Sequence, residues 1–548
     1  MDSRVSVFVR QRRINNLEQW TIYAILTEAF FLALSPTIAA AAVMIGVITW
    51  FLRAQIDSKY KMRSLPFDVP VAIFLLIGAL SVFLSSARSF ELIYNYCTLV
   101  GIYALTYLIV GQTIRKPEQI KQIAQALGAS AILVVLCGFF QFIFGIDAAD
   151  VKWTDPEAFP ELKKRIFSTL ENPNVLAGYL DVCICLALGI LAKIERRSHK
   201  LILIGAIILL VACLTMTYSR GAFLTLAIVF AIYGLLQDWR ILILFAAVTG
   251  IIFYSDSSFM NRILSTFAIS DTSESVRVGL WVSTSAMISD HPFTGIGWGA
   301  YQYVYPQYNY YIADPNVTIY HAHNIYLNFA AETGIVGALA FFWYFFGTMF
   351  MSLALGANER FVKIREFIED FADKKRAEFL SASSFAKDLA EMRNTIRTLL
   401  TDFSNNVLDL FGKKKTPLKL KKLRRNHREV IHNEEMNFSE HTRRKFANTD
   451  KNLEEENSFA EKNPVDDDDE EFFDEESAKP TKKSSNKSKK TLDLEDMKFI
   501  EGFRFGIGLA FLSMALNGFT DDLLFNIPSS MLMWQLGALS ASINLMNE

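Results

Sequence analysis

Long apolar stretches separated by short polar ones dominate the chain. Twelve of them reach about 17–25 residues, the length that an α-helix needs to span the hydrocarbon core of a bilayer. They lie at 17–34, 37–53, 67–85, 91–112, 124–145, 174–194, 199–217, 221–237, 239–255, 333–355, 501–518 and 528–545. The pattern therefore predicts an all-α, polytopic membrane protein of about twelve transmembrane helices.

Lysines and arginines gather in every second gap between these stretches. They precede the first stretch and follow the second (53–63), the fourth (115–121), the sixth (193–200) and the eighth (240). Short cytoplasmic loops carry an excess of positive charge, so both termini are predicted to be cytoplasmic. A long loop at 256–332, the loop at 146–173 and the turn around Ser219 are then predicted to face outward.

The segment 356–500 contains no spanning stretch, and the alternation of the loops makes it a cytoplasmic insertion. Apolar residues at helical spacing predict an amphipathic helix in its first part. The acidic run "DDDDEEFFDEE" and a Lys/Ser-rich stretch follow, and this charged part is predicted to be disordered because it has too little apolar surface to bury. The insertion is either a solvated linker or a segment that binds anionic lipid or a protein partner.

These boundaries divide the chain into four parts. The first, 1–145, holds N-terminal transmembrane helices, and 146–355 combines outer loops with further helices and carries the candidate chemistry. The insertion, 356–500, separates these from the C-terminal helices at 501–548. Basic residues at the N-terminus are not followed by a short apolar core and a cleavage site, so the first helix is predicted to be an uncleaved anchor.

Composition agrees with a membrane protein. Hydrophobic residues make up 51% of the chain and aromatic residues 13%. The net charge of -2 says little, because acidic and basic residues are segregated along the chain, and no nucleic-acid partner is expected. All five cysteines lie in apolar stretches, where a thiol behaves as a small hydrophobic group. We therefore expect no disulfide bond.

Basic side chains occur in each predicted outer loop. Arg165 lies in "LKKRIFSTLENPN", Arg220 in "TYSRG", and Arg277 in "SESVRVGLW", four residues before Trp281. A single interfacial arginine commonly reaches to lipid headgroups. Several arginines on one side of a membrane could together bind a diphosphate, because each guanidinium group can donate two parallel hydrogen bonds to phosphate oxygens.

Two histidines stand at the entrance to the tenth apolar stretch, in "YHAHN". His321 and His323 could cap a helix or take part in structural hydrogen bonds. They could also bind zinc, but no third ligand at a spacing typical of zinc sites accompanies them, so no metal is predicted. A neutral imidazole is a competent base near pH 7, which makes a histidine here a candidate for catalysis.

Glycines and tyrosines enrich the end of the long outer loop. Gly295, Gly297 and Gly299 do not follow a strand, which argues against nucleotide binding and favours a turn that folds over the membrane surface. The six tyrosines between 301 and 311 are either an aromatic belt or a surface for stacking on sugars.

Three motifs in this order resemble those of a known family. "SRGAF", then "RVGLW" with "HPFTGIGWGAY", then "HAHNIYLNFAAETGIVGALAFF" look like the O-antigen ligase and O-antigen polymerase superfamily, bacterial membrane glycosyltransferases of the GT-C class. The resemblance covers about residues 160–355. It implies a protein of the bacterial inner membrane that needs no cofactor. Such a protein acts on the outer face and moves a glycan from undecaprenyl diphosphate to an acceptor hydroxyl in polysaccharide or lipopolysaccharide biosynthesis.

The resemblance also assigns roles to residues. It implies that Arg220 and Arg277 hold the diphosphate of the donor and that His323 activates the acceptor, whereas His321 has no counterpart. Residues that could support these three are Arg165, Asn324, Glu332 and Trp281.

Alternatives within and outside the family remain. The acceptor could be lipid A-core, as in a ligase, another repeat unit, as in an O-antigen or exopolysaccharide polymerase, or a protein side chain, and the ligase is favoured. A polysaccharide flippase or other transporter would have a similar number of helices. It would also show internal repeats and polar residues near the midplane. Glu28 and Asp181 lie inside predicted helices, but no convincing repeat is evident and the polar cluster is concentrated at the outer face.

The alternation of basic loops predicts which engineered cysteines are accessible from outside. Cysteines near Asp155 and Asn316 should react with an impermeant maleimide in intact cells, whereas one at Ser485 should react only after lysis. Labelling at Ser485 in intact cells would contradict the predicted orientation.

Overall fold

The computed structural model describes residues 2–145, 165–255, 259–260, 263, 272–310, 318–354 and 483–546. The chain divides into two units, of which Met1–Arg365 with Lys483–Glu548 contains all these residues. The other unit, Glu366–Lys482, lies outside them, and so does most of the predicted insertion. Every regular element in the described ranges is helical and none is a strand, so the predicted all-α class is confirmed.

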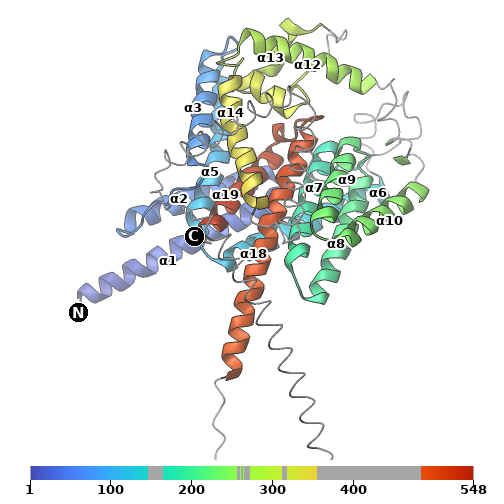
Figure 1. Ribbon diagram of the computed structural model, residues 1–548. Helices are drawn as coiled ribbons and strands as arrows, with labels where there is room; N and C mark the ends of the chain where they lie inside the picture. Colours follow the sequence, from blue (N-terminus) through green and yellow to red (C-terminus); the bar gives the residue numbers. More distant parts are fainter. Residues whose placement is uncertain are drawn as a thin grey trace, which may run out of the picture. The chain divides into compact units, whose positions relative to one another are not determined.

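The elements follow one another along the chain (Figure 1). In order they are α1 (Asp2–Phe31), α2 (Pro36–Ile56), α3 (Asp68–Leu84), α4 (Phe90–Asn95), the π-helix η1 (Tyr96–Val100), α5 (Gly101–Thr113), α6 (Pro117–Phe144), α7 (Pro173–Lys193), α8 (Arg197–Thr215), α9 (Arg220–Leu236), α10 (Trp239–Ser255), α12 (Thr272–Asp290), α13 (Tyr301–Val304), the 3₁₀-helix η3 (Tyr305–Tyr308), α14 (Ile325–Ala354), α18 (Lys483–Asn517), the 3₁₀-helix η5 (Leu523–Phe525) and α19 (Ile527–Met546).

Each predicted apolar stretch lies on a helix, but the helices differ in length. Seven segments among the described residues are long and apolar enough to cross a membrane: Pro36–Ile56, Phe90–Thr113, Pro117–Phe144, Pro173–Lys193, Arg197–Thr215, Ile325–Leu353 and Glu495–Asn517. The helices α3, α9 and α10 are apolar but shorter. The fold is thus that of a polytopic membrane protein, and the number of twelve spans stays a prediction.

Several helices start earlier than their apolar stretches, and two of them, α14 and α18, carry parts of the site. The helix α14 begins at Ile325, where the Asn324 side chain accepts a hydrogen bond from the Leu327 amide at 3.0 Å and so caps the first turn. The helix α18 begins at Lys483, so residues 483–500, assigned above to the insertion, are helical. Ion pairs tie this extension to its neighbours, since Lys498 contacts Glu195 at 2.5 Å and Asp496 contacts Lys121.

The loop that follows α12 packs into a break in the helix α14. Gly334 has φ +70°, which interrupts the helix. The Ile335 amide donates to the Pro292 carbonyl at 2.8 Å, and the Ile296 amide donates to the Ala331 carbonyl at 2.8 Å. Loop 291–299 thus satisfies backbone groups that the break would leave unpaired.

The helix α18 packs against α7 and α14, and also against α6, α9 and α19 (Figure 1). Its contact with α7 is the closest, because both helices carry glycine where they cross. A Cβ atom on Gly189 would lie 2.1 Å from the Gly506 nitrogen and 2.5 Å from the Gly502 carbonyl oxygen. Small residues let helix backbones approach in this way, and here they bring the C-terminal hairpin of α18 and α19 against the preceding helices.

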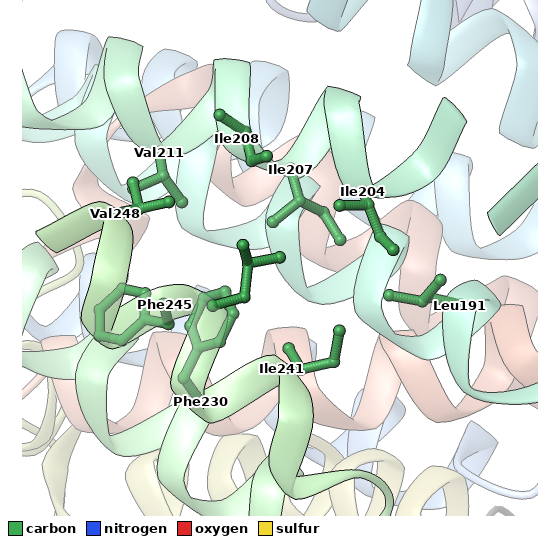
Figure 2. A pocket seen from close by; sticks show the side chains of 10 residues that line it. Leu191, Ile204, Ile207, Ile208, Val211, Phe230, Ile241, Phe245 and Val248 are labelled. Atoms are coloured by element: carbon green, nitrogen blue, oxygen red, sulfur yellow. The ribbon is translucent and has the colours of Figure 1, made fainter. Parts of the chain in front are cut away.

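A small apolar cavity lies among α7, α8, α9 and α10 (Figure 2). Its volume is about 20 Å³, and aliphatic and phenylalanine side chains such as Ile207, Phe230 and Phe245 line it. A space that small and apolar is a packing void rather than a ligand site.

The crossing of α7 and α18 predicts how a side chain there would act on stability. Gly189→Leu should lower the thermal unfolding temperature in detergent, because overpacking against a backbone costs on the order of 1–3 kcal/mol or more. Gly205→Leu on α8 is the matched control, since a Cβ atom there meets nothing within 4 Å. Equal unfolding temperatures for the two variants would contradict the proposed backbone contact.

Candidate active site

Four segments distant in sequence meet at one end of the helices. They are 165–174 before α7, 216–221 at the start of α9, 318–324 before α14, and 518–526 between α18 and α19. Backbone hydrogen bonds join them in pairs: the Ile166 amide donates to Met216 at 3.3 Å, and the Ile325 amide donates to Gly518 at 2.8 Å. The first three belong to the loops predicted to face outward, so the structure groups residues that the charge pattern assigned to one side.

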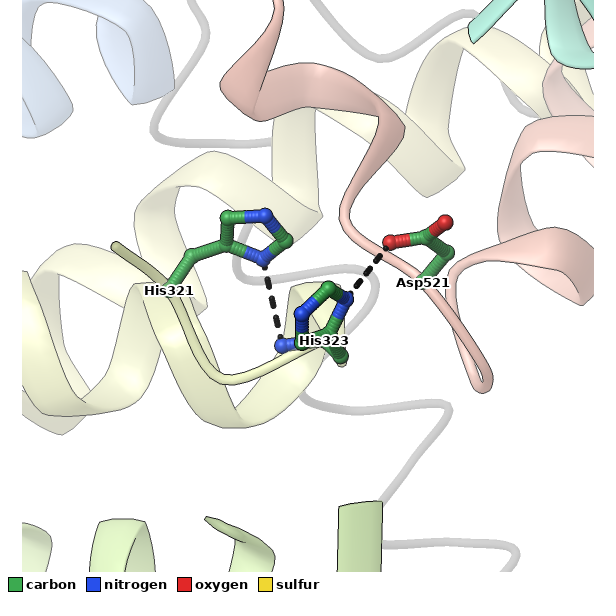
Figure 3. Close-up of side chains that lie close together, drawn as sticks. All are labelled: His321, His323 and Asp521. Carbon is green, nitrogen blue, oxygen red and sulfur yellow. Dashed lines mark hydrogen bonds and ion pairs between the residues drawn. The ribbon is translucent and has the colours of Figure 1, made fainter. Parts of the chain in front are cut away.

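His323 and Asp521 form the central pair of this site (Figure 3). The His323 Nδ1 lies 3.1 Å from the Asp521 Oδ1. A carboxylate can only accept a hydrogen bond, so Nδ1 donates it, and in the neutral ring Nε2 then keeps its lone pair. The His323 side chain is 37% exposed, which leaves the ring accessible as a base.

The carboxyl group of Asp521 is held in its ionised form. Burial alone would raise its pKa, but the hydrogen bond and charge of His323, and the charge of Arg277, outweigh burial and lower the pKa below its usual range. An ionised Asp521 keeps the His323 proton on Nδ1. The charge of Arg277, on α12, thus acts on the pair.

His321 supports the backbone of His323. Its Nδ1 accepts a hydrogen bond from the His323 amide at 3.2 Å, and its ring lies 4.2 Å from that of His323 and 4.6 Å from that of Phe525. Burial, and then the neighbouring charge of His323, lower the pKa of His321 to about 3, so its ring is neutral and Nδ1 is an acceptor. His323 has φ +49°, a conformation that costs roughly 1–2 kcal/mol for a residue other than glycine. The His321 hydrogen bond helps to hold it there.

A chain of hydrogen bonds connects this pair to Arg165. The Asn174 side chain donates to the Asp521 Oδ2 at 3.3 Å and accepts from Arg165 at 2.8 Å. Arg165 also donates to the Thr217 carbonyl at 2.8 Å, just before the "YSRG" turn. Arg165 thus joins the loop before α7 to the turn before α9.

Arg220 is the first residue of α9, next to the turn that carries Asp521. A Cβ atom on Gly221 would lie 2.9 Å from the Thr520 Oγ1, so the start of α9 packs directly on this turn. The N-terminus of a helix has a partial positive charge, which adds to that of Arg220. Both α9 and α12 therefore contribute positive electrostatic potential near Asp521 and His323.

The other predicted supporting residues have different places. Asn324 caps α14 and donates from its side chain to the Phe519 carbonyl at 3.1 Å, so it fixes the hairpin to the histidine loop. Trp281 lies one turn after Arg277 on α12, and its buried Nε1 has no hydrogen-bond partner among the described residues. Glu332 is buried in α14 and lines a separate cavity with Asn328 and Asp522.

The glycine and tyrosine predictions are met only in part. Gly295, Gly297 and Gly299 all have positive φ, as expected of a turn, but this turn packs into the break of α14. Tyr301 and Tyr305 are buried and stacked on each other, so they belong to neither a belt nor a sugar-binding surface.

Asp521 is the residue that the sequence analysis missed. It lies in "GFTDDLL", a polar turn between the last two apolar stretches, on the same predicted side as His323. The two adjacent acidic residues in this turn, Asp521 and Asp522, were the sequence signal that could have marked it as a candidate site. Nothing in the sequence linked it to a histidine nearly two hundred positions away, because that contact depends on the packing of α18.

His321, His323 and Asp521 together offer three possible metal ligands. The sequence pattern had offered only the two histidines. Ligand atoms of His321, His323 and Asp521 lie within 4.8 Å of one another. However, the His321 Nδ1 and the His323 Nδ1 each already take part in a hydrogen bond. A bound metal ion would have to use the Nε2 atoms or displace these bonds.

The fold and this site define a helical membrane protein with a histidine and aspartate pair beside two arginines. The family model for O-antigen ligase matches residues 178–342, which include Arg220, Arg277 and His323. The match covers less than a third of the chain, and it confirms the resemblance of the motifs within that region to the O-antigen ligase family. Members of this family are glycosyltransferase-like ligases and polymerases of membranes. A comparison with curated proteins finds no match.

The neighbouring carboxyl group of Asp522 predicts a dependence of stability on pH. Burial, and then the charge of Asp521, raise the pKa of Asp522 from 3.8 to about 7. A raised pKa means that the folded state binds the proton more tightly, so this contribution to stability is complete below pH 3.8 and is lost as the pH rises through 7.

Asp522→Asn should consequently reduce the fall in unfolding temperature between pH 5 and pH 8. The asparagine still accepts the hydrogen bond that the Phe525 amide donates to Asp522 at 3.2 Å. Glu118→Gln, at an exposed position on α6, is the control and should keep the slope of the wild type. An unchanged slope in Asp522→Asn would show that the group does not titrate in this range.

Proposed function

We propose that the protein is an inverting, metal-independent glycosyltransferase of the O-antigen ligase type. It moves a glycan from undecaprenyl diphosphate to an acceptor hydroxyl in cell-surface polysaccharide or lipopolysaccharide biosynthesis, at the outer face of the inner membrane. The observation that carries this proposal is the pairing of His323 with Asp521 beside Arg277 and the start of α9.

His323 is the general base in this mechanism. Its Nε2 takes the proton of the acceptor hydroxyl while the hydroxyl oxygen attacks the anomeric carbon of the donor sugar. Asp521 keeps the ring in the tautomer with Nδ1 protonated and stabilises the positive ring that forms. His321 and Asn174 are positioning residues, since each holds one member of the pair by a hydrogen bond.

The arginines act on the leaving group. As the bond between the anomeric carbon and the phosphate oxygen breaks, its electron pair moves onto the diphosphate. Arg277 and Arg220 stabilise that charge by charge-assisted hydrogen bonds. Because one displacement takes place, the configuration at the anomeric carbon inverts.

A polymerase would share this chemistry and differ in its acceptor. The ligase is favoured by the description of the matching family. The glycan profile of a deletion strain separates the two: free lipid A-core with accumulated lipid-linked long chains indicates a ligase, whereas core that bears a single repeat indicates a polymerase.

Substitutions in the purified protein test the assigned roles. With a lipid-linked oligosaccharide and acceptor, His323→Ala should lower turnover by roughly 10²–10⁴-fold, as for loss of a general base. Asp521→Asn should cause a loss in the same range, because the amide can donate to Nδ1 and favour the wrong tautomer. His199→Ala and Asp290→Asn, both at exposed positions, are the matched controls and should keep normal turnover.

The arginine variants test the other half of the mechanism. Arg277→Ala and Arg220→Ala should each lower turnover by roughly 10²–10³-fold, and lysine should rescue it partly because it restores charge without the paired hydrogen bonds. A chelator should have no effect. Near-normal turnover of His323→Ala, or chelator inactivation that zinc reverses, would contradict the mechanism and favour a metal site at His321, His323 and Asp521.

A further inference from the structure

A second cavity lies directly behind the histidine loop. Its volume is about 290 Å³, close to the lower end of the roughly 300–1,000 Å³ typical of small-molecule pockets. It is lined by residues of α4, η1 and α5, by loop 298–302, by α14 and by the turn at 522–527.

This cavity shares walls with the candidate active site. Phe525, one of its lining residues, contacts His321, with the two ring centres 4.6 Å apart. Asn328, another, accepts a hydrogen bond from the Ala322 amide at 3.1 Å, between the two histidines. Asp522 lines it next to Asp521. A molecule in the cavity would thus lie within reach of the histidine loop.

The lining has the chemistry of a site for a neutral sugar. It combines the amide side chains of Asn95 and Gln302 with the ring of Trp298. Among the described residues neither amide side chain has a protein hydrogen-bond partner, and the buried Glu332 Oε1 has none either. Sugar hydroxyls both donate and accept, which suits amides and carboxyl groups, and the apolar C–H face of a sugar ring suits an indole ring.

The same lining residues disfavour the diphosphate and the polyprenyl chain of the proposed donor. It contains no lysine, arginine or histidine, so a diphosphate would lose its hydration there without gaining a positive partner. Its polar side chains make it a poor place for a polyprenyl chain, because burying unpaired amides against hydrocarbon is costly.

We propose that this cavity binds an uncharged sugar ring of the acceptor, with Trp298 stacking on the ring and Gln302 and Asn95 binding its hydroxyl groups. The assignment to the acceptor rests on the proposed function, because the donor diphosphate is placed with the arginines. Recognition of a sugar by the cavity does not depend on that function and can be measured separately.

Saturation-transfer NMR on the full chain in phospholipid nanodiscs tests the binding. Glycoside detergents are avoided because their sugar groups would compete. The probes are the methyl glycosides of glucose, galactose and N-acetylglucosamine, with glucose 6-phosphate as the anionic counterpart. At least one neutral glycoside should receive magnetisation on its ring protons, and glucose 6-phosphate should bind more weakly than methyl glucoside.

Three variants connect the signal to the cavity. Gln302→Leu should weaken binding about 3- to 10-fold, as for loss of one neutral hydrogen bond. Trp298→Ala should weaken it at least as much, and Trp298→Phe should recover part of the loss, which excludes misfolding as the cause. Gln125→Leu, the same change at an exposed position on α6, should leave binding unchanged.

The outcomes separate this proposal from the proposed function. No transfer to any neutral glycoside, equal binding by Gln302→Leu and the wild type, or tighter binding of the phosphate would overturn the sugar site. In a turnover assay, Gln302→Leu should raise the acceptor KM and leave the donor KM unchanged. Sugar binding by a wild-type protein that transfers no glycan in this assay would refute the proposed function and leave the sugar site standing.

Discussion

The contact between glycine residues of α7 and α18 is the constraint on which the rest of the structure depends. Gly189 meets Gly502 and Gly506 so closely that no side chain fits between the two backbones. The helix α18 follows a long insertion, and nothing in its own sequence fixes where it docks. Its close approach to α7 sets the position of the turn at 518–526, and with it Asp521. A loosened crossing would separate the aspartate from His323 while leaving both helices intact.

The site is built from strained loops that are held by hydrogen bonds. Ser168, Glu171, Tyr218 and His323 all have positive φ, and all four lie in the loops that converge on the site. Such conformations persist only where the surroundings fix them. Gln141 accepts hydrogen bonds from the amides of Phe167 and Ser168, and His321 accepts one from His323. Strain at these positions fits a site whose groups must be in place before the substrate arrives.

Basic side chains act on the histidine and aspartate pair but are absent from the lining of the cavity. The charge of Arg277 acts on Asp521 and the start of α9 packs on Thr520, whereas the cavity with Glu332 and Asp522 holds no basic side chain. A transfer from a charged donor to a neutral acceptor needs this separation, because the two substrates must approach His323 from different directions. The proposed glycosyltransferase and the proposed sugar site thus use one arrangement of charges.

The sequence by itself determined the helical class, the positions of nearly all apolar helices and the motifs of the region that matches the family model, because hydrophobic length and short motifs are local properties. It offered His323 and the arginines as candidates but not Asp521. Only the tertiary structure decided which of these side chains touch. It paired His323 with Asp521 across the insertion, placed Asn174 between Asp521 and Arg165, and moved Glu332 into a separate cavity. Those contacts follow from how helices pack, and packing depends on complementary surfaces, such as the glycines of α7 and α18, that no single segment of sequence reveals.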